Sequence, residues 1–284
     1  MNKDKTILKT LLLGSFFASL SAMLGGSTFV FTRYVVDSID PFTLSFLRYG
    51  LTGLILFLLS ISVYMNKKFA KADLIPMCFL GLAMITLFPN FMALGLEHTT
   101  AARAGLLYAT MPLCTIIIAY FFNIEKITLN KSLAVLLAIL GVSFCMSERV
   151  DNNFQDTLKG DFLMMIGVLS ASCFTVFSGK YLKKYGNIPV MIFVILIGTI
   201  LNLIISMIFG NSIMSLLEIN KFEAAALLML IIPGGVVMMY CWGKALQLIS
   251  PTQAAISLGF NPLTAILLGS IILNEEITFK LGIG

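Results

Sequence analysis

The chain has 284 residues, of which 58% are hydrophobic and only 12% are charged. Soluble domains carry about 45–50% apolar and about 25% charged residues, so this composition excludes an ordinary soluble protein. The net charge of +5 is not gathered into a basic stripe, and no nucleic-acid partner is expected.

Apolar runs of about 20 residues, enough to cross about 30 Å of hydrocarbon, recur along the whole chain. The first run continues to Val36 without a convincing stop, which favours an uncleaved span over a signal peptide. If the N-terminus is cytoplasmic, twelve of the 19 Lys and Arg residues fall on the cytoplasmic side, as the positive-inside rule favours. The charged breaks predict nine spans, at residues 11–36, 42–64, 74–96, 101–123, 131–147, 161–180, 188–210, 222–242 and 251–273.

An internal repeat divides the chain into two halves. Residues 93–128 align without gaps to residues 243–278 at an offset of 150, which places Pro112 on Pro262 and Glu125 on Glu275. A proline followed at one fixed distance by Glu-x-Ile-Thr in both halves is hard to obtain by chance. The boundaries predicted are a first repeat at 1–147, a linker at 148–160 and a second repeat at 161–284.

An odd number of spans in each repeat forces the second copy to insert upside down, as in many secondary transporters. The fold class predicted is therefore an all-α polytopic membrane protein with two inverted five-helix repeats. A copy of the fifth span would begin at about residue 281, so the last helix is expected to be missing from this chain.

Three segments resemble the EamA-type drug/metabolite transporter superfamily: PFTLSFLRYGLTG from Pro41, the stretch ending at Thr128, and its copy ending at Thr278. The resemblance implies ten helices in two repeats of five, and a carrier that exports amino acids or related metabolites. It implies a cytoplasmic (inner) membrane location. The partners expected are a small-molecule substrate and the lipid bilayer, with a homodimer as one option.

The sequence lacks the residues that intramembrane enzymes use. Its carboxylates all lie in loops or at span ends, it has a single histidine, and it contains no HExxH motif. No catalytic residue, metal site or cofactor is expected. The alternative to a transporter is a membrane-embedded accessory subunit or an enzyme without transport activity.

Arg48 is the only basic residue well inside a predicted span. A cation at this depth is costly in hydrocarbon and calls for a partner. Two interpretations remain open. The guanidinium could meet a substrate carboxylate, or it could reach the outer interface or a carbonyl of a neighbouring helix.

Prolines inside spans free backbone carbonyls that lipid cannot satisfy, so they predict kinks near a pathway. A pathway also needs apolar walls with a few polar groups. The gating or kink residues predicted are Pro89, Pro112, Pro233, Gly234 and Pro262. The substrate-binding residues predicted are Ser27, Phe31, Arg48, Asn90, Tyr108, Thr175, Tyr240, Trp242, Gln253, Ser257 and Asn261.

The small residues Gly14, Ala18, Ala22 and Gly26 recur every four positions in the first span, which is typical of close helix packing rather than of a site. The function predicted from all these features is a secondary-type transporter of a small metabolite, an exporter that works by alternating access.

Overall fold

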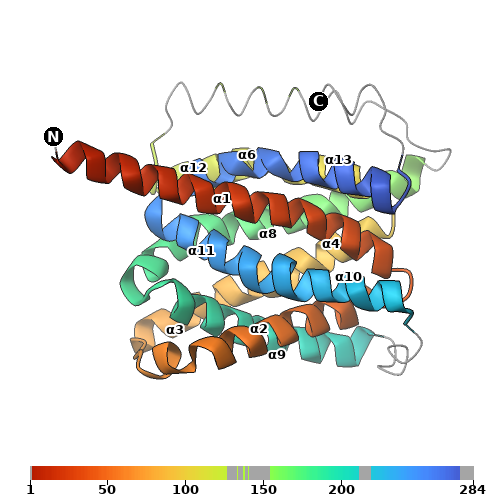
Figure 1. The fold of residues 1–284 in the computed structure, drawn as a ribbon, viewed down its shortest axis with the longest axis horizontal. Coiled ribbons are helices and arrows are strands. Elements are labelled where there is room, and N and C mark those ends of the chain that lie inside the picture. The colour runs from red at the N-terminus through yellow and green to blue at the C-terminus, as the bar shows by residue number, and fades with distance from the viewer. Residues whose placement is uncertain are drawn as a thin grey trace.

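A computed structural model describes residues 2–126, 154–210 and 219–275, together with positions 133, 137 and 140. The described elements are all helical (Figure 1). Their bounds are α1 Asn2–Val35, α2 Pro41–Met65, α3 Lys71–Gly81, η1 Leu82–Leu87, α4 Phe88–Leu96, α5 Ala101–Tyr108, α6 Met111–Phe121, α8 Phe154–Tyr185, α9 Asn187–Phe209, α10 Lys221–Ile231, η3 Ile232–Val237, α11 Met238–Leu248, α12 Pro251–Ile256, η4 Ser257–Gly259 and α13 Phe260–Ile272.

Eight helical stretches within the described residues are long and apolar enough to cross a membrane. They correspond to eight of the nine predicted spans, so the all-α polytopic prediction is confirmed. The remaining predicted span, 131–147, lies almost entirely outside the described residues, and so does the segment where its copy would begin. Large side chains such as Leu59 and Phe121 face outward, as lipid-exposed surfaces require.

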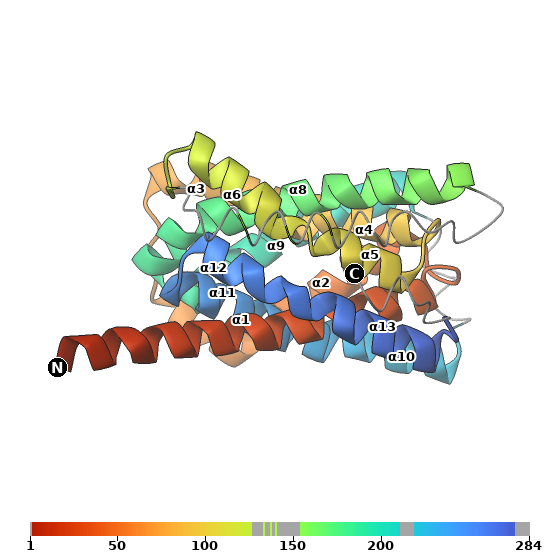
Figure 2. The same cartoon turned by 90° about the horizontal axis from the view of Figure 1, so that it is seen from above.

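The helices run roughly along the long axis of one bundle (Figures 1 and 2). The helices α2 and α9 lie along one side in Figure 1, and α6, α12 and α13 along the other. We call one end of the bundle the Asp37 end, since it holds the turn between α1 and α2. The opposite end, where α8 finishes, is the Lys184 end.

The two repeats have opposite directions. The helix α5 starts at the Asp37 end and α6 finishes at the Lys184 end, whereas their copies α12 and α13 run the other way (Figure 1). Residues near the helix ends, such as Glu125 and Glu275, therefore have copies at the opposite end of the molecule. This is the inverted arrangement that the repeat predicted.

Each repeat carries the same two interruptions of regular helix. A π-helical turn occurs at Leu82–Leu87 and again at Ile232–Val237, 150 residues later. A second break separates α5 from α6 at residues 109–110, and its copy is η4. Wide π-turns are rare and concentrate at functional sites, so their recurrence marks the same region of both repeats.

Side chains from neighbouring helices satisfy carbonyls around both π-turns. The hydroxyl of Thr52 donates to the Ile231 carbonyl at 3.1 Å, and the amide of Asn202 donates to the Ile85 carbonyl at 2.8 Å. A carbonyl released from the regular ladder has no water to bond in a bilayer. Contacts with α2 and α9 therefore allow these wide turns to persist.

The small-residue stripe of α1 packs against the second repeat. Ala18 and Ala22 are fully buried. A methyl group at Gly14 would lie 2.4 Å from Cγ2 of Ile249, and one at Gly26 would lie 2.4 Å from the Asn261 carbonyl oxygen. The stripe therefore has the packing role predicted for it, and it brings α1 directly against α11 and α13.

Candidate functional site

A narrow cavity lies where α1 meets the interrupted helices of both repeats. It has room for about one water molecule, about 20 Å³. A metabolite with several heavy atoms would need this space to widen. The lining residues are Ser21, Gly25, Thr28, Phe29, Met84, Phe88, Tyr108, Met238, Met239, Trp242, Leu258 and Asn261.

Two polar side chains of the cavity have atoms without a hydrogen-bond partner among the described residues, whereas Ser21 and Thr28 donate to backbone carbonyls. Asn261 is fully buried, and within the part of the chain that the structure describes neither its Oδ1 nor its Nδ2 has a hydrogen-bond partner. The indole Nε1 of Trp242 is also buried without an acceptor. Leaving a buried polar group unpaired costs about 1–3 kcal/mol, so two such residues in one cavity indicate a place where a ligand supplies the missing bonds.

Aromatic rings form one wall of the cavity. The ring of Tyr108 lies 5.5 Å from that of Phe29 and 5.2 Å from that of Phe88, measured between centroids. Tyr108 is the last residue of α5, directly before the break at residues 109–110. A movement at this break would therefore reposition the wall.

Three of the predicted substrate-binding residues line this cavity: Tyr108, Trp242 and Asn261. Ser27 and Thr175 instead bond carbonyls of their own helices, at 2.7 and 2.9 Å. Gln253 is exposed and caps the start of α12.

Four further predicted residues lie outside the cavity lining. Asn90 is paired with Asn202 at 2.9 Å, and Phe31 packs on a separate small cluster of apolar side chains. Tyr240 lies 6.3 Å from the Phe17 ring, and Ser257 begins η4. Their roles in binding stay predictions.

The predicted kink residues all lie at helix interruptions. Pro233 and Gly234 belong to η3, and Pro89 lies two residues after the end of η1. Pro112 and Pro262 lie in the first turns of α6 and α13, immediately after the second break of each repeat. This placement fits the steric effect of proline on the preceding turn, and a gating role stays a prediction.

Sequence reasoning missed most of the lining. Ser21, Gly25, Met84 and Met238 carry no distinctive pattern, because apolar residues that face lipid and apolar residues that face a cavity look alike in a sequence. The small-residue stripe of α1 was the one signal available for this part of the lining, because Ser21 and Gly25 directly precede its members Ala22 and Gly26.

Arg48 lies deep in the bundle and is 2% exposed. Its Nη2 donates to the Gly234 carbonyl of η3 at 2.9 Å, so a carbonyl of a neighbouring helix is one of its partners, as the second interpretation anticipated. The guanidinium carbon also lies 4.9 Å from the centre of the Tyr49 ring. Its Nε is buried without a partner.

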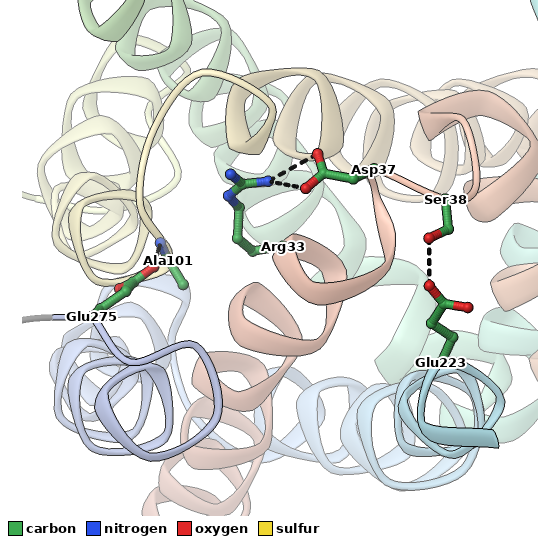
Figure 3. A network of polar contacts seen from close by, with 6 residues as sticks. All are labelled: Arg33, Asp37, Ser38, Ala101, Glu223 and Glu275. Carbon is green, nitrogen blue, oxygen red and sulfur yellow. Dashed lines mark hydrogen bonds and ion pairs between the residues drawn. The ribbon is translucent and has the colours of Figure 1, made fainter. Parts of the chain in front are cut away.

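The repeated glutamates cap helices of the opposite repeat. Glu275 accepts hydrogen bonds from the backbone N–H groups of Ala101 and Ala102, at 2.9 and 3.2 Å, at the start of α5 (Figure 3). Glu125 accepts one from Thr252 at 3.1 Å, at the start of α12. A carboxylate suits a helix N-terminus because the first N–H groups have no partner in the helix.

Removing one of these caps should weaken the fold without abolishing it. We expect Glu275→Ala and Glu125→Ala each to lower the free energy of unfolding by about 1–2 kcal/mol, the usual cost of a lost helix cap. Apparent melting temperatures of the full chain in detergent would measure this. Glu97→Ala, at an exposed position, is the control and should change little. Equal melting temperatures for all three variants would contradict the capping role.

Other polar contacts join separate elements at the Asp37 end. Ser38, in the turn after α1, donates to Glu223 of α10, and Arg33 pairs with Asp37 at 3.1 Å (Figure 3). Arg103 and Asp161 form a buried ion pair, 2.7 Å between Nη2 and Oδ2, which joins α5 to α8. These bonds hold the Asp37 end together in the conformation observed.

The eight membrane-length helices and the inverted repeat define an integral multi-pass membrane protein of the transporter type. The chain matches the model of the EamA-like transporter family over residues 12–147 and 158–284, and it belongs to that family.

Proteins similar in sequence to this chain are also named as transporters. An "uncharacterized transporter" of Archaeoglobus fulgidus is 27% identical over 94% of this chain and 91% of its own length. The "uncharacterized transporter YoaV" of Bacillus subtilis is 24% identical over 92% of this chain and 89% of its own. A solved crystal structure superposes with a TM-score of 0.72 over 97% of this chain and 92% of its own, at 17% identity, which shows the fold alone.

Proposed function

We propose that this chain is a secondary transporter that carries a small metabolite, an amino acid or a related compound, out of the cell by alternating access. The substrate binds in the cavity between α1 and the interrupted helices of the two repeats. The membrane is the cytoplasmic (inner) membrane, with the N-terminus inside.

The observation that carries this proposal is the set of unpartnered polar atoms on Asn261 and Trp242 in a cavity walled by aromatic rings. Small-molecule sites are mostly apolar with a few convergent polar groups, and transporters place theirs at the interface of inverted repeats. The cavity meets both conditions, since its lining comes from spans of each repeat.

Alternating access is supported by the interruptions of the helices. The lining includes residues of η1 and η4, together with others directly beside η3 and beside the break that ends α5. Hinges absorb dihedral changes at a few such positions. Rotation about these points would widen the cavity toward one end and then toward the other.

Transport by proteoliposomes containing the full chain tests the proposal, with a panel of labelled amino acids, small organic acids and amines. We expect saturable flux of at least one compound. Asn261→Leu and Trp242→Phe should each reduce that flux by about tenfold or more, since each removes a hydrogen-bonding group from a dry site. Asn66→Leu, at an exposed loop position, is the control for insertion and yield.

Two outcomes would overturn parts of the proposal. Wild-type rates and substrate range in both cavity variants would show that the substrate passes elsewhere. Flux no greater than that of protein-free vesicles for every compound would favour the accessory-subunit alternative.

A further inference from the structure

Two arginines are buried in this bundle, and they differ in their partners. Arg103 pairs with the Asp161 carboxylate through hydrogen bonds of 2.7–3.1 Å from its Nε and Nη2. Within the described residues Arg48 has no carboxylate partner; it bonds the Gly234 carbonyl and lies beside the Tyr49 ring. The sequence places every carboxylate in a loop or at the end of a predicted span.

A guanidinium has five N–H donors and keeps its charge in proteins. Arg48 uses one donor on a backbone carbonyl, and its Nε finds no acceptor. A buried charge without a counter-ion is expensive, and structural arginines in membranes usually pair or reach water. Among the described residues Arg48 has no carboxylate partner and its Nε bonds nothing, which indicates that its counter-charge arrives with a ligand.

Arg48 does not line the cavity described above, but it lies close to the lining residue Thr28. Its Nη2 lies against Gly234, where a methyl group would be 3.9 Å from that nitrogen and 2.7 Å from Cγ2 of Thr28. Thr28 lines the cavity. The guanidinium therefore lies where α1, α2 and η3 meet, one residue away from the cavity wall.

We propose that Arg48 is kept without a carboxylate so that it binds the anionic group of the transported molecule, which makes the substrate a small carboxylate with an apolar body. The carboxylate takes the free donors of Arg48, the apolar body lies against the aromatic wall, and Asn261 bonds a further polar group. This inference rests on the proposed transport function and adds the charge of its substrate.

Arg48→Met tests the proposal without knowledge of the substrate, because the substitution removes an unpaired charge. We expect the ligand-free variant to melt at the wild-type temperature or above it in detergent. Arg103→Met is the matched control. It strands the buried carboxylate of Asp161 and should melt well below wild type. A large loss of thermal stability in Arg48→Met would mean that Arg48 serves only to stabilise η3 through the Gly234 carbonyl. That result would overturn the proposal.

A second measurement addresses charge directly with isosteric probes: phenylacetate, phenylacetamide and 2-phenylethylamine, and the corresponding series built on 4-methylpentanoate. We expect at least one carboxylate to raise the melting temperature of the wild-type chain more than its amide or amine. Arg48→Met should bind that carboxylate at least about 30-fold more weakly, as expected when one partner of a buried charge pair is removed.

The outcomes separate this inference from the proposed function. Equal stabilisation by acid and amide, unaffected by Arg48→Met, would overturn the anionic substrate while transport of another compound stands. Preference for the amine, or no selective stabilisation by either carboxylate, would also overturn it. Absence of flux for every compound in proteoliposomes would instead count against transport itself.

Discussion

Asp161→Leu should destabilise the protein by about 3–5 kcal/mol, because it removes the carboxylate that the buried guanidinium of Arg103 bonds. The side chains of Arg103 and Asp161 are only 6% and 8% exposed, so water cannot replace the lost partner. The Nε and Nη2 atoms of Arg103 both bond the carboxylate, in the bidentate geometry that makes such pairs strong. Thermal unfolding of the full chain would measure the loss.

The double variant Arg103→Met/Asp161→Leu distinguishes a pair interaction from a general packing defect. Replacing both charges by apolar groups of similar size is often neutral. We therefore expect the double variant to recover most of the stability lost in Asp161→Leu. A double variant as unstable as the single one would show that the pair is not the source of the effect.

Gly26→Ala should disrupt the contact between α1 and α13, whereas Gly25→Ala should not. At Gly26 the new methyl group would lie 1.7 Å from Oγ1 of Thr264 and 2.4 Å from the Asn261 carbonyl oxygen. The second of these atoms is backbone, so the helices must separate. Overpacking of this kind typically costs about 1–3 kcal/mol.

At Gly25 the methyl group would meet only the end of the Asn261 side chain, at 3.1 Å from Oδ1. A side chain can yield by that amount, so we expect near wild-type melting of Gly25→Ala with altered transport. Gly26→Ala/Thr264→Ala relieves the closer contact and should recover part of the stability. Equal melting temperatures of the two single variants would contradict this account of α1 packing.

The architecture was largely predictable because two independent signals specify it. Apolar runs of sufficient length identify the spans, and the offset of 150 residues that aligns Pro112 with Pro262 identifies the inverted repeat. The prolines also indicated where the helices break. Pro89 indicated a break close to η1, although the π-turn at Leu82–Leu87 itself contains no proline.

The cavity was only partly predictable, for a physical reason. Hydrophobic patterning tells polar residues from apolar ones, but it does not tell which face of a membrane helix contacts lipid and which contacts protein. Asn90 and Asn261 looked equivalent in the sequence, each beside a proline. In the fold the Nδ2 of Asn90 donates to Asn202, whereas among the described residues neither polar atom of Asn261 has a hydrogen-bond partner.

The caps formed by Glu125 and Glu275 have a consequence for biosynthesis. The ribosome completes the first repeat long before it adds Glu275. The start of α5 therefore lacks its Glu275 cap until translation of this sequence is nearly finished. The reverse holds for α12, which finds Glu125 already inserted. The second half of the nascent chain thus finds its cap already present, whereas the N–H groups of Ala101 and Ala102 in the first half stay uncapped until Glu275 is made. The first half of the chain should accordingly need membrane chaperones more than the second half does.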